Sequence, residues 1–360
     1  MIDLTSLMRP HLVQAETYSS VNPVEEQSRL SGLPSDEIVR LNANENPFGP
    51  TEAVREALKG IPLHLYPDPN QRRLRDALAA YTRQPPECIL VGAGADELID
   101  LPMRLFLNPN DSVIDCDPTF GVYRFLARVC GAPVVSVPRD HKWEVNVESV
   151  IQAANPLTKI IFLASPNNPT GNLLPEPDAR RLLELGIVVI IDETYGEFAD
   201  QTLAHLLSEY NNVAIIRSFS KWAGIAGLRV GYMIASPVLI SHLIDIKQPY
   251  NVNIAAEAAV LAALDDTESL FANVRVLIAQ RLRLERAIDK LKGVSYWPSS
   301  GNFLLCKFDG NTAKSVSESL AARGLFVRYF SHPRLQNCLR MSAGTPAQTG
   351  KLIDALNEIM

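Results

Sequence analysis

The strongest constraint on the fold is a regular alternation between residues 112 and 247, where short apolar runs are separated by segments of helical pattern. Short, continuous apolar strands that alternate with helices are typical of a mostly parallel sheet with helices on both faces. We therefore predict an α/β fold. The expected strands are 112–116, 133–137, 159–163, 187–191, 213–217 and 231–235, and the expected helices are 119–130, 147–154, 176–185 and 237–247.

The flanking segments differ from this region. Residues 1–39 are polar and irregular apart from an expected helix at 23–31, and residues 42–50 are a loop rich in asparagine and proline. Further expected elements before residue 112 are helices at 52–59 and 72–81 and a strand at 88–91. After residue 253 we expect helices at 254–264, 267–291, 312–323 and 346–358 and strands at 303–308, 326–328 and 339–342. The pattern predicts a large domain over 41–250 and a smaller α/β domain over 251–360.

The composition argues against several classes of protein. Apolar residues make up 47% and charged residues 21% of the chain, as in a folded globular enzyme. The net charge is −6 and the basic residues are dispersed, so we expect no nucleic-acid surface. We expect neither a secretory signal nor a membrane span. Five scattered cysteines without a Cys-x-x-Cys pair favour reduced thiols in the cytoplasm, and the dispersed histidines argue against a metal site.

A polar stretch follows the expected strand 213–217 and contains Ser218, Ser220, Lys221 and Arg229. A lone lysine among hydroxyls is usually a solvated surface residue. Here two hydroxyls and a planar guanidinium could surround a phosphate, with the lysine beside it in a largely apolar pocket. In such a setting a lysine amine becomes a usable nucleophile or base. A phosphate-bearing cofactor held as a lysine Schiff base suggests pyridoxal 5′-phosphate (PLP).

Two motifs carry a family resemblance. Arg-Ser-Phe-Ser-Lys at 217–221 with Ala-Gly-Leu-Arg-Val-Gly-Tyr at 226–232 resembles the PLP-lysine segment of the fold-type-I aminotransferases, the histidinol-phosphate aminotransferases above all. Leu-Asn-Ala-Asn-Glu-Asn-Pro at 41–47 resembles the signature near the start of the same family. The resemblance covers nearly the whole chain. It implies the fold of type I PLP-dependent transferases, an N-terminal segment at 1–40 that packs on the small domain, and a homodimer.

Residues 92–97, Gly-Ala-Gly-Ala-Asp-Glu, follow the expected strand 88–91 and precede a helix. Gly-x-Gly after a strand invites a dinucleotide-binding interpretation, but Glu97 occupies the place of the third glycine, so we reject it. Backbone amides at a helix N-terminus still make an anion site, here from Gly94, Ala95 and Asp96. The resemblance implies that these amides bind the PLP phosphate.

The resemblance also assigns the remaining cofactor residues. Phe120, where the family commonly has tyrosine, stacks on the pyridine ring. Asn168 and Tyr195 donate to the phenolic oxygen. A carboxylate at the end of an apolar strand is costly to bury unpaired, and Asp192 is expected to keep the pyridine nitrogen protonated. Tyr66 reaches the phosphate of the other subunit. The catalytic residues implied are Lys221, Asp192 and Tyr195.

Four residues are expected at the substrate. Arg328 and Arg340 match family positions that hold the anionic end, phosphate in one half-reaction and the glutamate carboxylate in the other. Asn44 belongs to the Leu-Asn-Ala-Asn-Glu-Asn-Pro motif. Many family members carry a substrate-binding tyrosine after a proline in the N-terminal segment; this chain has Val24 there, and Tyr18 is the expected substitute.

The resemblance implies that L-histidinol phosphate is transaminated with 2-oxoglutarate to imidazole acetol phosphate and L-glutamate in histidine biosynthesis. Two alternatives remain open. An aromatic amino-acid aminotransferase would use the same cofactor residues. A lyase resembling threonine-phosphate decarboxylase would share the lysine segment and need no keto acid. A PLP-binding transcription regulator is not favoured, because such proteins add a basic DNA-binding domain.

Overall fold

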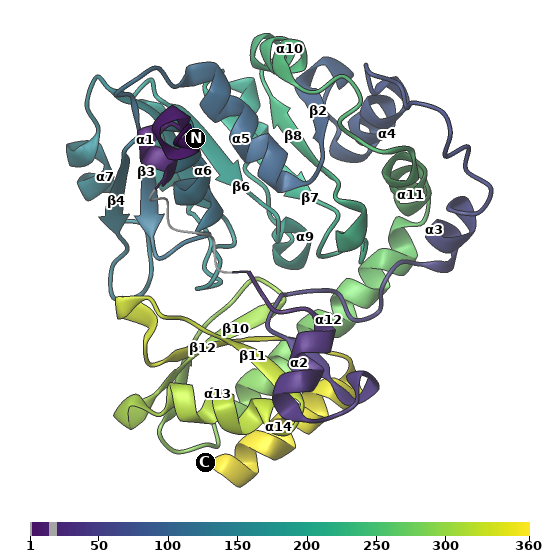
Figure 1. The fold of residues 1–360 in the computed structure, drawn as a ribbon, viewed down its shortest axis with the longest axis vertical. Helices are drawn as coiled ribbons and strands as arrows, with labels where there is room; N and C mark the ends of the chain where they lie inside the picture. The colour runs from purple at the N-terminus through teal and green to yellow at the C-terminus, as the bar shows by residue number, and fades with distance from the viewer. Residues whose placement is uncertain (1, 14–19) are drawn as a thin grey trace.

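Two sheets organise the fold of the computed structural model, which describes residues 2–13 and 20–360 (Figure 1). The larger sheet has seven strands in the order β2-β8-β7-β6-β5-β3-β4. The α/β class predicted from the sequence is confirmed. The strands are β2 (Ile89–Gly92), β3 (Ser112–Asp117), β4 (Val134–Pro138), β5 (Thr158–Ala164), β6 (Val188–Asp192), β7 (Val213–Ser218) and β8 (Gly231–Ala235).

Strands β3 to β7 of the larger sheet are parallel to one another, whereas β8 runs antiparallel to both β2 and β7. The sheet is apolar on both faces. Ile161 and Leu163 belong to one hydrophobic cluster, and Ile160 and Phe162, which alternate with them, belong to the other. Side chains of adjacent strand residues point to opposite faces, so both faces must be covered by helices.

Helices cover each face of the larger sheet. Helices α5 (Ala95–Phe106), α6 (Val122–Cys130) and α10 (Pro237–Ile246) contribute to the cluster that contains Phe162. The opposite face is covered by α4 (Arg72–Thr82), α7 (Val147–Ala153), α8 (Glu176–Leu183), α11 (Ile254–Asp265) and the first half of α12 (Thr267–Ile288). Helix α11 also packs against α3 (Glu52–Ala57). The remaining short helix of this part is α9 (Gly196–Ala199).

The second sheet has five strands in the order β1-β11-β12-β10-β9. They are β1 (Val39–Leu41), β9 (Val294–Trp297), β10 (Phe303–Phe308), β11 (Leu325–Tyr329) and β12 (Cys338–Ser342). The last half of α12 packs on it together with α13 (Ala313–Ala321) and α14 (Pro346–Ile359). Figure 1 shows α12 running from the larger sheet to the smaller one. The domain limits at residues 40 and 250 stay a prediction.

Two strands of the second sheet were not expected from the sequence. Strand β1 is short, and it gains its partner from far along the chain, since it pairs in parallel with β11. Strand β9 has only partly buried or exposed residues and pairs with one neighbour, so it lacks the apolar run of a core strand. The prediction of irregular structure over residues 1–39 was therefore wrong at residue 39, where β1 begins.

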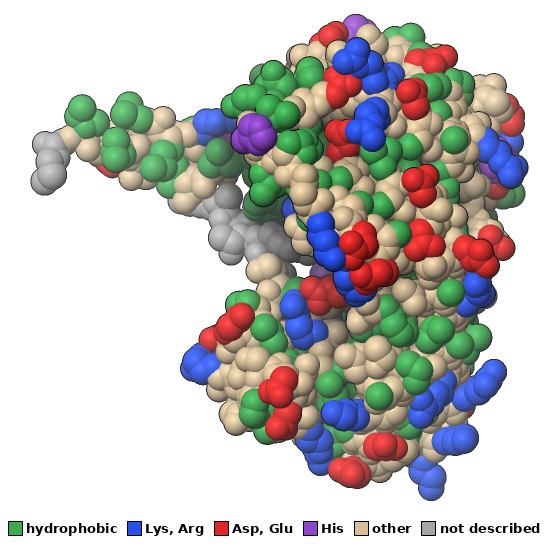
Figure 2. All heavy atoms as spheres, turned by 90° about the vertical axis from the view of Figure 1, so that its right-hand side faces the viewer, with side chains coloured by type: hydrophobic (Ala, Val, Ile, Leu, Met, Phe, Trp, Pro, Cys, Tyr) green, Lys and Arg blue, Asp and Glu red, His purple; other side chains and the backbone are tan. Residues whose placement is uncertain are grey.

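The N-terminal residues form two separate contacts. Helix α2 (Val24–Ser31) lies beside α13, whereas α1 (Pro10–Val13) packs against α6 of the larger sheet. Before α1, the turn η1 (Leu4–Leu7) projects from the body, as Figure 2 shows. The apolar side chains of this projection are exposed: Ile2, Leu4, Leu7 and Met8. Tyr18, expected at the substrate, lies outside the described residues.

The other 3-10 turns are η2 (Ser35–Glu37), η3 (Pro86–Cys88), η4 (Ala204–Ser208), η5 (Ala226–Leu228), η6 (Asp309–Asn311) and η7 (Pro333–Leu335).

Candidate active site

Polar side chains gather at the carboxyl ends of the larger sheet's strands, where it faces the smaller sheet. Asp192 is the last residue of β6 and Ser218 the last of β7, while Asn168 follows β5. Parallel strands present their carboxyl ends at one edge, and ligands of open α/β sheets bind there. The order of these strands in the sheet therefore brings together residues that are far apart in the sequence.

Lys221 follows β7 at this edge of the larger sheet and is partly buried. Its Nζ donates a hydrogen bond to the carbonyl oxygen of Ala43 at 3.0 Å. Burial first, and then the positive charge of Arg340, lower the pKa of Lys221 to about 8. Desolvation and a like charge both disfavour the ammonium form. About a tenth of the amine is thus neutral at pH 7, far more than for an ordinary lysine, and the neutral amine is the form that acts as a nucleophile or general base.

Asp192 is buried, and both of its oxygens accept hydrogen bonds. Oδ1 accepts from the backbone N–H of Thr194 at 2.9 Å, and Oδ2 from the hydroxyl of Tyr123 at 2.7 Å. Burial raises the pKa of Asp192, while these hydrogen bonds act in the opposite direction. A buried carboxylate that is held by two neutral donors can receive a cationic group of a ligand.

Tyr195 lies on the other side of the cleft, with its ring edge-on to Phe303 at 5.0 Å between centroids. Its hydroxyl accepts from Asn44 Nδ2 at 2.9 Å, and Asn44 Oδ1 accepts from Ser342 Oγ at 2.8 Å. The backbone carbonyl of Asn44 accepts from Asn302 Nδ2 at 3.0 Å. Asn44 is therefore held by both sheets. Sequence reasoning gave no role to Ser342 or Asn302, since only the fold brings them to Asn44.

Arg340, on β12, is buried and crosses from the smaller sheet to the larger. Nη1 donates to Asn168 Oδ1 at 2.5 Å and Nη2 donates to the carbonyl of Asn42 at 2.6 Å. Its guanidinium also lies over the rings of Phe303 and Phe330, at 5.6 and 5.9 Å from their centroids. A planar fork in such a position can bind a carboxylate or a phosphate through two hydrogen bonds.

Arg328 is the direct cross-strand neighbour of Arg340 in the antiparallel pair β11–β12. Its Nη1 donates to the carbonyl of Ser20 at 3.4 Å, and its guanidinium lies 5.8 Å from the centroid of Phe330. The two arginines expected at the substrate are thus brought together, with Phe330 beside both. Paired guanidinium groups at one end of a cleft favour an anionic ligand.

A second cationic group lies at the opposite end of the site. Arg229 is exposed, forms an ion pair with Asp96 at 2.9 Å and approaches Gly94 so closely that a Cβ there would lie 2.8 Å from Nη2. Ser218 is the cross-strand partner of Gly231 in β8. A Cβ added at Gly231 would lie 3.2 Å from the backbone nitrogen of Ala95. Ser218 at the end of β7, the Arg229 guanidinium and the N-terminus of α5 therefore lie together in one corner that could hold an anion, which we call the anion corner.

Two further residues that the sequence predicts beside the cofactor are Ser220 and Phe120. Ser220 is buried, and its backbone N–H donates to Ser218 Oγ at 3.2 Å. Phe120 is partly buried after β3, with its ring edge-on to Tyr123 at 5.7 Å between centroids. Tyr66 is different, because it is 79% exposed and stacks on Tyr250 at 4.4 Å, away from the other residues of the set.

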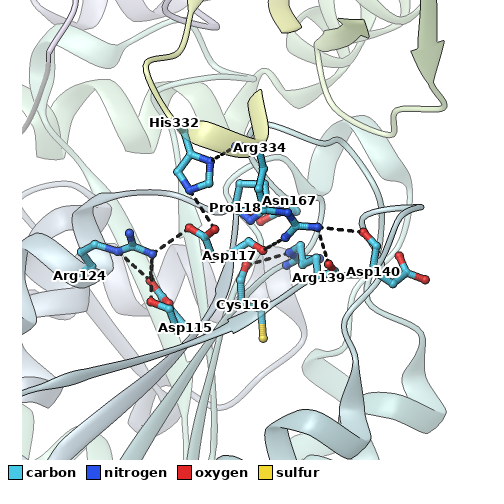
Figure 3. A network of polar contacts seen from close by, with 11 residues as sticks. Asp115, Cys116, Asp117, Pro118, Arg124, Arg139, Asp140, Asn167, His332 and Arg334 are labelled. Atoms are coloured by element: carbon cyan, nitrogen blue, oxygen red, sulfur yellow. Dashed lines mark hydrogen bonds and ion pairs between the residues drawn. The ribbon is translucent and has the colours of Figure 1, made fainter. Parts of the chain in front are cut away.

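Figure 3 shows how a loop of the smaller sheet is held against the end of β3. Arg334 donates from Nη1 to the carbonyl of Asp117 at 2.8 Å and from Nη2 to that of Arg139 at 2.6 Å. His332 Nδ1 accepts from the backbone N–H of Arg334, so Nε2 is the donor to Asp117 Oδ2 at 2.9 Å. We call this set of contacts the β3 anchor. Arg334 also lies over the ring of Trp143, 4.7 Å from its centroid.

The loop carrying Phe120 is tied to the one carrying Asn168 by Asn167. Its Nδ2 donates to the carbonyl of Pro118 at 3.0 Å, and its Oδ1 accepts from Thr119 Oγ1 at 2.7 Å. Asn167 is fully buried, and the neighbouring Asn168 is the one that meets Arg340. Asn167 therefore connects the two loops, whereas Asn168 forms a hydrogen bond with Arg340.

The donor set fits PLP. It offers an anion corner for a phosphate, an amine of lowered pKa for an aldehyde and a buried carboxylate for a ring nitrogen. Within residues 2–13 and 20–360 no three His, Cys, Asp or Glu side chains are grouped to hold a metal ion. In the same part of the chain, no helix has the length and apolar character needed to cross a bilayer.

Comparison with known proteins identifies the family. Residues 36–356 match the family model described as aminotransferase class I and II. The chain is 44% identical over 366 residues to a histidinol-phosphate aminotransferase of Roseiflexus castenholzii, with 99% of both proteins covered. It is 43% identical over 359 residues to the chloroplastic histidinol-phosphate aminotransferase 1 of Arabidopsis thaliana, covering 98% of this chain and 86% of that protein. The crystal structure of histidinol-phosphate aminotransferase from Sinorhizobium meliloti in complex with PLP matches with a TM-score of 0.88 at 25% identity, covering 99% of both chains.

Proposed function

The chain belongs to the class I and II aminotransferases, and among them to the histidinol-phosphate aminotransferases, and we propose that it transaminates L-histidinol phosphate with 2-oxoglutarate. The products are imidazole acetol phosphate and L-glutamate, in the biosynthesis of histidine. The enzyme uses PLP, and we propose that the cofactor is bound as a Schiff base of Lys221. The observation that carries the proposal is the Lys221 amine, with a pKa near 8, in the same cleft as Arg340.

Each end of the cleft has a role in this proposal. The anion corner of Ser218, Ser220, Arg229 and the N-terminus of α5 holds the cofactor phosphate. Asp192 holds the charge of the pyridinium nitrogen, Asn168 and Tyr195 bind the phenolic oxygen, and Phe120 packs on the ring. PLP, when bound, supplies an electron sink for the reacting carbon. Lys221 Nζ removes a proton from the reacting carbon of the substrate as general base and afterwards donates a proton as general acid.

The substrate's anionic end is held by Arg328 and Arg340 in the proposed complex. Both substrates carry an anion, a phosphate in one case and carboxylates in the other, and a guanidinium fork accepts either through two hydrogen bonds. Their cross-strand pairing keeps the two guanidinium groups at one place on the smaller sheet. Asn44 lines the same cleft between the two sheets and is held by Tyr195 and Ser342.

We also propose a homodimer in the cytoplasm. Tyr66 is 79% exposed on a surface that also exposes Leu63 and Leu65, at 75% and 56%. Exposed apolar side chains of this kind favour a protein interface. A tyrosine that does not reach its own chain's site is available to a partner's. All five cysteines are free thiols, which suits a reducing compartment.

The test uses the purified PLP-loaded protein and L-histidinol phosphate, without a keto acid. The absorption band of the lysine-bound cofactor should convert to that of pyridoxamine phosphate, and 2-oxoglutarate should reverse the change. Conversion by L-phenylalanine or L-tyrosine but not by L-histidinol phosphate would replace the substrate by aromatic amino acids. Release of carbon dioxide from L-threonine phosphate, with no need for 2-oxoglutarate, would indicate the lyase instead.

A further inference from the structure

Tyr123 is a fully buried tyrosine of α6 whose hydroxyl reaches the candidate site. It donates a hydrogen bond to Asp192 Oδ2 at 2.7 Å, and Asp192 is the last residue of β6. A buried tyrosine hydroxyl usually needs a partner, and a carboxylate is among the strongest acceptors available. The hydroxyl therefore contacts the carboxylate that the proposed function gives to the pyridinium nitrogen.

The ring of Tyr123 is fixed on two sides. It stacks on Phe162 of β5, with centroids 5.1 Å apart and planes 10° apart, and it meets Phe120 edge-on at 5.7 Å and 86°. Phe162 is buried in the centre of the sheet, so it gives the tyrosine a rigid support. One side chain thus connects the sheet, the carboxylate and the aromatic ring expected beside the cofactor.

The charges around the carboxylate explain why a donor is needed there. Burial raises the pKa of Asp192, and the negative charge of Asp96 on α5 acts in the same direction. Tyr123 and the backbone N–H of Thr194 counter both, because hydrogen bonds to the charged form favour it. Burial also raises the pKa of Tyr123, so the phenol keeps its proton and remains a donor, with Arg139 acting weakly in the opposite sense.

We propose that Tyr123 is a positioning residue, which orients the Asp192 carboxylate toward the cofactor nitrogen, keeps it ionised, and holds Phe120 in place. The inference rests on the proposed function, since it takes Asp192 as the partner of the nitrogen. It makes a prediction that packing alone does not. Removing only the hydroxyl leaves the ring contacts with Phe162 and Phe120 intact, so any effect on the cofactor comes through Asp192.

The test compares Tyr123→Phe with Tyr296→Phe, a control at a hydroxyl that makes only a long contact of 3.4 Å with Asp289 near the surface. For Tyr123→Phe we expect about a tenfold rise in the dissociation constant of PLP and about a tenfold fall in kcat with little change in KM, as for one lost hydrogen bond to a charged group. The acid side of the kcat pH profile should move to higher pH. The control should match the wild type.

A double-mutant cycle shows whether the hydroxyl acts through the carboxylate. In an Asp192→Asn background, Tyr123→Phe should change PLP affinity by less than about twofold, because coupled residues are not additive. An equal tenfold effect in both backgrounds would overturn the proposal, as would unchanged affinity, kcat and pH profile in the single variant. If the proposed substrate is wrong, the wild type and Tyr296→Phe will bind PLP but will not convert L-histidinol phosphate, and the effect of Tyr123→Phe on PLP affinity can still be measured, which separates the two failures.

Discussion

Arg340 donates a hydrogen bond to the side-chain oxygen of Asn168, and this 2.5 Å contact joins the smaller sheet to the larger one within the candidate site. One partner is expected to bind the substrate and the other the cofactor. A ligand anion at Arg340 must therefore share the guanidinium with a residue of the cofactor site. Substrate binding is thereby linked to the relative position of the two sheets.

We predict that Arg340→Lys raises KM for both substrates by about tenfold or more, while PLP affinity stays within about threefold of the wild type. Lysine keeps the charge, but a single ammonium cannot reproduce the planar fork. Steady-state kinetics and PLP titration measure the two quantities. The matched control is Arg323→Lys, an exposed arginine whose nearest carboxylate is that of Glu358 at 3.7 Å. An unchanged KM would remove Arg340 from the substrate site.

The reaction of the cofactor-free protein with PLP should depend on pH through Lys221. With a pKa of about 8, its amine is protonated and unreactive at lower pH, and the rate of attachment should rise through pH 8 and level off above it. Arg340→Gln removes the nearby positive charge that lowers this pKa, so the midpoint should move to higher pH. Stopped-flow absorbance gives the rate, and Lys221→Ala is the control that should show no covalent attachment. A midpoint unmoved by Arg340→Gln would contradict the charge coupling.

The larger sheet was predictable because its strands are continuous apolar runs, buried on both faces. Each of the six predicted strands between residues 112 and 235 corresponds to an observed one with ends shifted by no more than a residue. The predicted helix starts also agree to within a residue, with one exception. The helix expected from residue 119 begins at Val122, since Asn167 holds Thr119 and Pro118 in a loop. Such contacts between distant segments are not visible in a local pattern.

The site was predictable where a residue ends a strand and not where it depends on tertiary contacts. Asp192 and Ser218 end apolar strands, and their place at the same sheet edge follows from the fold class. Strand β1, which leads to Asn44, pairs with a segment far away in the chain, and its alternating pattern covers only three residues, too few to identify a strand. Tyr123 is only three residues from Phe120, which the sequence did predict, but its hydroxyl contact depends on how α6 packs on the sheet.

The β3 anchor should contribute to stability. We predict that Arg334→Ala lowers the free energy of unfolding by about 1 kcal/mol, because it loses hydrogen bonds to main-chain carbonyls and the contact with Trp143. Denaturant unfolding followed by tryptophan fluorescence measures this change. The comparison is Arg323→Ala, an exposed helix-end arginine that should stay within about 0.5 kcal/mol. Equal effects of the two substitutions would show that the anchor adds nothing.

Subunit mixing tests whether Tyr66 serves the partner's site. A Lys221→Ala homodimer should be inactive, and a Tyr66→Ala homodimer should bind PLP more weakly because it lacks a hydroxyl at the phosphate. In a mixed dimer, the site with the intact lysine receives the intact tyrosine from the other subunit, and the second site carries both defects. At PLP concentrations that limit the Tyr66→Ala enzyme, activity should therefore exceed the mean of the two homodimers. If Tyr66 acted in its own chain's site, no mixed site would be whole and the activity would equal that mean. Tagged chains, purified as the mixed species by two affinity steps, make this comparison quantitative.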